Sequence, residues 1–449
     1  MPHPPPAPAV IGELHDCYGY KFHWTDKHLT EEQLKPLLYT YDTLGSEALV
    51  RVQEHKAANG KATTGPAARE DLFTVVKELA LTGEDEVVNK LWKEVNTVPD
   101  WVDWDQIKRA QDVFYRYGEA FLIGGTFSSL VAGMGAARIS ETLARTGGFA
   151  PKVGRKRLLE TTQHLLNVTK NLESIQPGGQ GWLDCVRVRL LHASVRSRIL
   201  GMVKTKPSYY DVESFGVPIN DQDTIATIAT YSSQAIWLAL PSQGIYLKEQ
   251  EIADYIQLWR LVAYYMGTPT DVFATPELSK SYFDSVLEAD LKPSEISKVL
   301  ANNIITVLTD KPPNYPSKDF LYAQSRVYNG EHLCDDLGIP KASYIGYGKA
   351  YMQISLIMAI TYIFRSIPSL DKWRLQHNRK DFWEKIVTGK DGLGDETKFK
   401  MQYIPEFDTL SKLEKVGSGA SVATKNFMTM VVAVLVPMGA AGAMYALAK

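Results

Sequence analysis

The sequence predicts an all-α protein built as a multi-helix bundle. From about residue 70 onward, apolar residues recur at spacings of three and four, as they do along one face of a helix. Runs of alternating apolar and polar residues bounded by turn residues, which would indicate strands, are scarce. With 45% hydrophobic and 22% charged residues, the chain has the composition of an ordinary folded protein.

Charge and cysteine content exclude several functional classes. The 49 Lys and Arg residues nearly balance the 51 Asp and Glu residues, so the basic surplus of a protein that coats nucleic acid is absent. Three widely separated cysteines, Cys17, Cys185 and Cys334, are too few for a disulfide framework or a four-thiolate zinc site. The low cysteine content predicts a reducing, intracellular compartment.

Four segments are expected along the chain. Residues 1–70 form an N-terminal arm, partly disordered because it begins with a proline-rich stretch. Residues 71–370 form the helical domain, 371–425 a polar linker or extension, and 426–449 a candidate membrane anchor. Within the domain, helical periodicity predicts helices over residues 105–117, 155–172, 183–200, 224–239, 248–266, 283–309 and 346–364.

Two segments are apolar enough to raise the question of a membrane. Ala120–Ala137 is almost uncharged and about 18 residues long, but its glycines and serines favour a helix packed inside the bundle. Phe427–Ala448 carries no charge, lies between Lys425 and Lys449, and is long enough to span a bilayer. It predicts a C-terminal membrane anchor, and a core helix of the bundle is the alternative.

Common catalytic motifs are missing: we find no Walker A loop, nucleophile elbow or His-Glu-x-x-His sequence. One helical segment stands out instead. Around His192, the residues three and four positions away are Val188, Arg189, Val195 and Arg196, which share its helix face. An imidazole can bind haem iron, valines can pack on the macrocycle, and arginines can pair with propionates. The alternative is a satisfied core histidine with arginines in structural ion pairs.

The preceding helix offers a second group of candidates. Arg157 and Thr161 are four residues apart and therefore share a face, and Glu141 lies upstream. A guanidinium, a hydroxyl and a carboxylate could line the far side of a pocket. Alternatively, the two charged residues belong to the helix surface and the threonine has no special role.

These segments together resemble the catalytic domain shared by ER-bound oxygenases of the mycophenolic-acid type and by latex clearing protein, the rubber oxygenase. The resemblance covers about residues 75–365. It is carried by Arg157–Thr161, Pro177–Gly181, Val188–Arg196, Gly216–Asp223 and Trp259–Gly267.

The resemblance implies a helical bundle around haem b that oxidises or cleaves a carbon–carbon double bond of a lipophilic isoprenoid or unsaturated substrate with dioxygen. By position, His192 matches the proximal iron ligand, and Arg189 and Arg196 match the arginines beside it. Arg157 and Thr161 match a distal arginine and threonine, which are expected to be catalytic. Glu141 stands where the family's acid/base glutamate is expected.

This sequence departs from the rubber-cleaving branch at one position. The residue before the threonine can be a lysine there, able to approach the iron, whereas here it is Glu160. A lysine-capped closed state is therefore in doubt.

A membrane-associated enzyme on the cytosolic face, for example of the endoplasmic reticulum, is the leading hypothesis. The alternatives are a non-enzymatic haem or lipid carrier on the same bundle, and a membrane scaffold with a second span at Ala120–Ala137.

Overall fold

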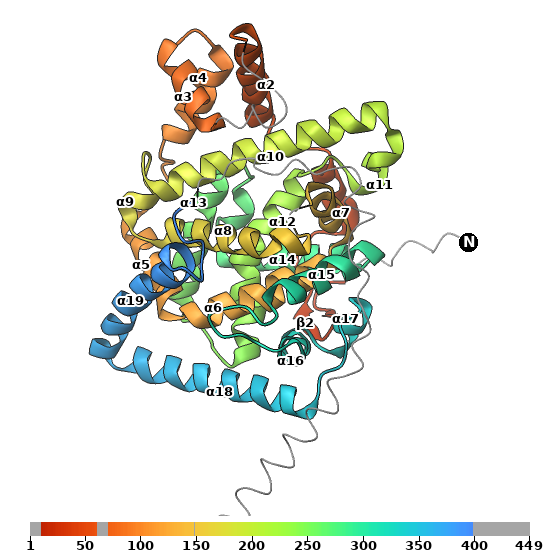
Figure 1. Ribbon diagram of the computed structural model, residues 1–449, viewed down its shortest axis with the longest axis vertical. Coiled ribbons are helices and arrows are strands. Elements are labelled where there is room, and N and C mark those ends of the chain that lie inside the picture. The colour runs from red at the N-terminus through yellow and green to blue at the C-terminus, as the bar shows by residue number, and fades with distance from the viewer. Residues whose placement is uncertain (1–9, 61–70, 148, 398–449) are drawn as a thin grey trace, which may run out of the picture.

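The structure, a computed structural model, describes residues 10–60, 71–147 and 149–397. Helices dominate these ranges and confirm the all-α prediction (Figure 1). In the first third of the chain, the α-helices are α1 (Glu31–Leu34), α2 (Thr43–Ala58), α3 (Leu72–Thr82), α4 (Glu86–Asn96), α5 (Trp104–Arg116), α6 (Gly118–Gly124) and α7 (Ala137–Thr146). They are followed by α8 (Pro151–Thr169), α9 (Leu172–Ile175), α10 (Gln180–Thr205), α11 (Val212–Phe215), α12 (Asp221–Tyr231) and α13 (Glu249–Tyr265). The last are α14 (Pro276–Asp290), α15 (Glu295–Leu308), α16 (Lys318–Asn329), α17 (Glu331–Asp336), α18 (Tyr344–Ser366) and α19 (Pro368–Trp383).

A small antiparallel hairpin precedes the helices. Its strands are β1 (Leu14–Cys17) and β2 (Tyr20–His23), and Leu14 pairs with His23. Tyr18 and Gly19 form the two-residue turn with φ values of 53° and 92°. Positive φ at both turn positions matches the right-handed twist of the strands that they connect.

Helix α10, which contains the candidate residue His192, packs against helices from several parts of the chain. It is 26 residues long and contacts α2, α3, α8, α9 and α13. Figure 1 shows it crossing the molecule, with α2, α3 and α4 on one side and the remaining bundle on the other. One apolar core includes Leu190 of α10 and Trp259 of α13, and a second surrounds α15 and α16.

Two long predicted helices are interrupted. The segment 283–309 is divided into α14 and α15, because Pro293 cannot donate a backbone hydrogen bond. The segment 224–239 is divided into α12 and the π-helical turn η6 (Ala235–Ala239). Periodicity alone does not reveal such breaks, because the apolar spacing continues through them.

The segment Ala120–Ala137 is buried, as predicted, but it is not one α-helix. It consists of the end of α6, the π-helix η3 (Gly125–Val131), the 3₁₀-helix η4 (Ala132–Gly135) and the start of α7. Phe127, Ser128 and Val131 are buried there. No helix within the described ranges is both long enough and apolar enough to cross a membrane. The candidate anchor Phe427–Ala448 lies outside the described residues.

The first part of the predicted polar linker lies in a helix that contacts the bundle. Asp371 of α19 accepts hydrogen bonds from Arg116 of α5 at 2.7 and 2.8 Å, and Asn378 donates to the Tyr115 carbonyl oxygen at 2.9 Å. Two helices that are distant in sequence, α5 and α19, are therefore joined by direct contacts.

Candidate active site

Glycines fix the position of helix α10. A Cβ atom on Gly179 would lie 2.0 Å from the Glu173 carbonyl oxygen, and one on Gly181 would lie 2.7 Å from that of Asn167. No side chain fits at either distance, so the start of α10 can approach α8 and α9 only with glycine at these positions. The glycines of the Pro177–Gly181 motif thus allow α10 to pack closely against α8.

One flank of α10 faces α2 and α4. Arg189, almost fully buried, donates from Nε and Nη2 to Asp42 at 2.8 and 2.7 Å, and from Nη1 to Glu94 at 2.8 Å. A bidentate arginine–carboxylate pair is strong and directional. These contacts give Arg189 a structural role between α10, α2 and α4, and the predicted pairing with propionates stays a prediction.

Arg196, one helical turn beyond His192, lies on the same flank as Arg189. It donates to the carbonyl oxygens of Pro218 and Ile219 at 3.2 and 2.6 Å and to Ser46 Oγ at 2.8 Å. Its guanidinium also lies 4.6 Å from the centre of the Tyr41 ring. Ile219 has a φ of 56°, an unfavourable value for a β-branched residue, and Arg196 binds its carbonyl oxygen.

The other flank of α10 contains His192 between Val188 and Val195, and all three side chains are partly accessible. Burial, followed by the positive charge of Arg196, lowers the pKa of His192 to about 4. The His192 side chain is therefore surrounded mostly by protein atoms, with part of its surface accessible. Its imidazole is neutral at pH 7 and therefore has a nitrogen lone pair for a metal.

Helix α8 lies opposite this flank. The charges of Arg157 and His164 both lower the pKa of His192, so the structure brings these α8 residues close to it. Arg157 Nη1 lies 3.6 Å from Glu160 Oε2, and the Arg157 side chain is 40% exposed. Thr161, on the same face of α8, is exposed. Glu160 is buried and lies near Lys156 as well as Arg157.

His164 is the residue that sequence reasoning missed. Burial lowers its pKa to about 4, so it too is neutral at pH 7. It lies seven residues after Arg157 and three after Thr161, which places it on the same helix face. This spacing could have identified His164 as a further candidate from the sequence alone.

Glu141 is placed differently from the other candidates. It forms an ion pair with Arg145 one turn further along α7, and Arg145 also donates to the Tyr209 carbonyl oxygen at 2.6 Å. The Arg145 guanidinium lies 5.2 Å from the Tyr210 ring centre. Among the described contacts, those of Glu141 lie in α7 and thus do not join it to His192.

The residues present fit haem at the axial position. A neutral, partly accessible imidazole on a helix, with valines beside it, is chemically suited to bind haem iron. No group of three or more His, Cys, Asp or Glu side chains in the described ranges has the arrangement to hold a metal ion directly. A porphyrin needs only one such protein ligand.

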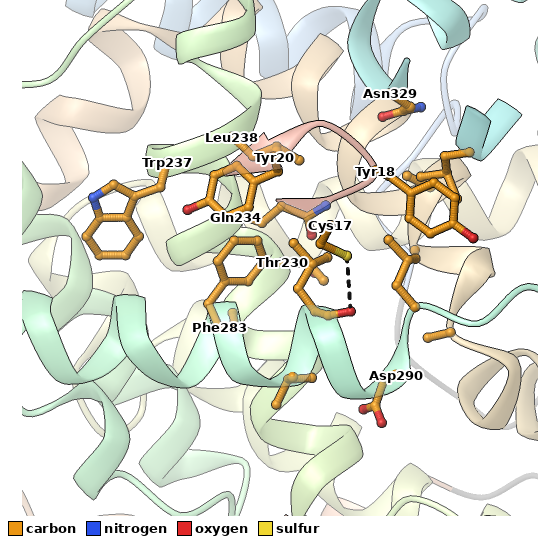
Figure 2. Close-up of a pocket in the computed structure, with 18 of the residues that line it drawn as sticks. Cys17, Tyr18, Tyr20, Thr230, Gln234, Trp237, Leu238, Phe283, Asp290 and Asn329 are labelled. Atoms are coloured by element: carbon orange, nitrogen blue, oxygen red, sulfur yellow. Dashed lines mark hydrogen bonds between the residues drawn. The ribbon is translucent and has the colours of Figure 1, made fainter. Parts of the chain in front are cut away.

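A separate apolar pocket of about 440 Å³ lies elsewhere in the bundle (Figure 2). Small residues form part of its wall, namely Ala132, Gly133, Ala136, Ala226 and Ala229. Figure 2 shows the aromatic side chains of Tyr18, Tyr20, Trp237 and Phe283 around it. None of the described residues that line it lies on α8 or α10.

The pocket favours uncharged molecules. Asp290 is the one charged residue in its described lining. That carboxylate is already paired with Arg138 at 2.7 and 2.9 Å and accepts hydrogen bonds from Gln222. A charged ligand would find no free counterion in this lining.

The family model for the catalytic domain of ER-bound oxygenase mpaB/B′ and rubber oxygenase matches residues 77–352. The chain belongs to this family. The match contains α8, α10 and all of the predicted site residues. Family membership establishes an oxygenase, hence an oxidoreductase, while the role of each residue stays a prediction.

A solved structure supports the fold. The structure of latex clearing protein LCP in the closed state matches with a TM-score of 0.59 and 17% sequence identity, over 77% of this chain and 90% of that chain. At this identity the likeness concerns the fold. No curated protein sequence matches the chain significantly.

Proposed function

We propose that the protein is a haem b-dependent oxygenase that oxidises or cleaves a carbon–carbon double bond of a lipophilic isoprenoid or unsaturated substrate with dioxygen. Membership of the oxygenase family supports the reaction class. The observation that carries the haem assignment is His192, neutral and partly accessible on the flank of α10 that faces α8.

Each residue has a defined part in this proposal. His192 would supply the nitrogen ligand to the haem iron, and Val188 and Val195 would supply an apolar surface beside it. When bound, haem b would supply an iron centre for the chemistry of dioxygen. Arg157, whose charge acts on His192, and Thr161, on the same face of α8, would supply hydrogen-bond donors that orient the reactants. Glu141 supplies a carboxylate that accepts an allylic proton, for which its ion pair with Arg145 must open.

An optical spectrum of the purified protein tests the haem assignment. The wild-type chain is expected to show a Soret band that disappears in His192→Ala. The control is His332→Ala, because His332 is an exposed histidine of α17 and its replacement should leave the band unchanged. Absence of the band from the wild-type protein after haem reconstitution would overturn the assignment.

Membrane attachment through Phe427–Ala448, at the cytosolic face of an internal membrane, is the second part of the proposal. Its length and uncharged composition support it. After a high-salt wash, which releases proteins held at the membrane surface by charge, the wild-type chain should stay in the membrane fraction. A variant without residues 426–449 should be released by the same wash and keep its Soret band. Release of the wild-type chain together with the variant would contradict this part alone.

The apolar pocket favours a second candidate function, namely a non-enzymatic carrier of an uncharged lipid. A Cβ atom added at Gly133 would meet no heavy atom within 4 Å, so Gly133→Leu places a side chain in the pocket without a clash at Cβ. Farnesol binding measured by calorimetry should weaken in this variant. The exposed Gly201→Leu, which also meets nothing within 4 Å, should bind like wild type. Binding without substrate-dependent oxygen uptake would favour the carrier.

A further inference from the structure

Helix α18 has an apolar face that no described element covers. Nearly half of the strongly exposed large apolar side chains in the described ranges lie between Tyr344 and Trp373. On α18 they are Tyr344, Tyr351, Met352, Leu356 and Ile363, with exposed fractions from 56% to 93%. Scattered exposed apolar residues need no explanation, but a contiguous patch marks an interaction site.

The exposed side chains follow the helical repeat and form one continuous stripe. Residues 344, 348, 351, 352, 355, 356, 359 and 363 are all exposed, at spacings of three and four. The opposite face contacts the bundle through buried Gly346, Ala350 and Thr361. Near the C-terminal end of the helix, the Tyr362 hydroxyl also donates to the Gly244 carbonyl oxygen at 3.0 Å. Figure 1 shows α18 along the lower edge of the molecule. The helix is thus anchored on one side, and no part of the described ranges covers most of the other.

Charge distinguishes the possible occupants of this stripe. No Asp or Glu occurs between Asp336 and Asp371, whereas Lys341 and Lys349 do. Arg365 donates hydrogen bonds to Tyr117 and the Tyr246 carbonyl oxygen of the bundle. Two acidic residues, Asp319 and Glu331, accept hydrogen bonds from Ser343 and Tyr347, which do not belong to the exposed stripe. Lys341 and Lys349 are exposed. Basic residues beside an apolar helix face are attracted to the anionic surface of a cytoplasmic leaflet.

The aromatic residues lie where a membrane interface favours them. Tyr344 and Tyr351 lie on the N-terminal half of the stripe, with exposed fractions of 93% and 58%. Tyrosine and tryptophan are enriched at the boundary between lipid and water, because their rings are apolar and their polar ends stay hydrated. A helix of this length is about 35 Å long at 1.5 Å per residue, so several lipids can contact it at once.

We propose that α18 docks on the surface of an anionic lipid bilayer, with its axis parallel to the membrane and its outer stripe in the headgroup region. The opposite face stays on the bundle. This surface is independent of both the oxygenase assignment and the candidate anchor Phe427–Ala448.

A local probe tests the proposal in the full-length chain, because the anchor could bind vesicles by itself. Met352→Cys, made in a Cys17→Ser background, is labelled with an environment-sensitive dye; Cys185 and Cys334 are buried. The matched control is Leu81→Cys on α3, 75% exposed and at the opposite end of the molecule in Figure 1.

Vesicles of phosphatidylcholine and phosphatidylserine should shift the emission at position 352 to shorter wavelength and lower iodide quenching several-fold. Position 81 should not change. Leu356→Glu should remove the response at position 352, because it places a charge within the stripe.

Three results would overturn the proposal. The first is unchanged quenching at position 352 in vesicles to which the protein has bound. The second is protection that appears without lipid and rises with protein concentration, which would mean a second copy. The third is a dye shielded from iodide before lipid is added, which would mean that another part of the chain covers the stripe.

Discussion

The two flanks of helix α10 differ in how their side chains are satisfied. On one flank, buried Arg189 and Arg196 have hydrogen-bond partners from α2, α4 and the loop before α12. On the other, Val188, His192 and Val195 are partly accessible. The arginine flank stabilises the fold, and the histidine flank is the one to which the proposed function assigns haem binding. Although Arg189 and Arg196 are only three and four residues from His192, their side chains therefore have different surroundings from that of His192.

The largest effect is expected at Arg189. Arg189→Ala leaves Asp42 and Glu94 without their shared cation, and breaking a buried ion pair in this way costs about 3–5 kcal/mol. Chemical denaturation would measure the loss. Lys204→Ala, an exposed position in the last turn of α10, should change stability by less than about 0.5 kcal/mol. Equal stability of the two variants would contradict the structural role of the arginine flank.

Arg196→Ala is expected to cost about 2–3 kcal/mol, because hydrogen bonds from a charged donor to two carbonyl oxygens are lost. Part of the cost should come from Ile219, whose φ of 56° is then less well held. Adding Ile219→Gly should recover part of the stability, since glycine adopts this φ readily. A double-mutant cycle with no coupling would refute the link.

On the histidine flank we expect a pH effect in the haem-free protein. The pKa of His192 and that of His164 are both about 4 in the folded chain and near 6.5 when unfolded. Between these values the unfolded chain binds more protons at these two sites, so the two histidines lower stability as the pH drops from 6.5 toward 4. Asp184 and Asp223, whose pKa values burial raises to about 7 and about 6, act in the opposite direction. The slope is about 1.4 kcal/mol per pH unit for each group.

Denaturation at pH 7, 6 and 5 would measure this slope. Relative to wild type, His192→Gln should remove a fall of about 1.4 kcal/mol per pH unit between pH 6 and 5, while His332→Gln, at an exposed site, should leave the pH dependence intact. A slope that is unchanged in His192→Gln would show that this histidine is not desolvated.

The smallest effect on stability is expected at Val188. Because this side chain is partly accessible, Val188→Phe should alter the free energy of unfolding by no more than about 1 kcal/mol, below the usual cost of overpacking a filled core. The same change should abolish the Soret band, since a larger ring one helical turn before His192 would hinder the approach of haem to its imidazole. A large loss of stability would mean that this flank is already filled.

Much of the candidate site could be predicted from local spacing. Arg157 and Thr161 share a face of α8, and His164 would have been found by extending the same spacing one turn further. The partners of Arg189 could not be predicted, because Asp42 and Glu94 are 147 and 95 residues away in sequence. The ion pair of Glu141 with Arg145 follows the i,i+4 rule and was readable, but its position away from His192 was not.

The sequence by itself determined the helical class, the position of most helices and the family, because periodicity, glycine and proline positions and short motifs are local properties of the chain. The tertiary structure decided which flank of α10 is packed and which stays accessible, and where Pro293 and the π-turns interrupt helices. It also decided that one apolar face of α18 is left exposed by the residues of ranges 10–60, 71–147 and 149–397. These outcomes depend on which distant segments meet, since burial and ion pairing are properties of the packed chain and not of any single segment.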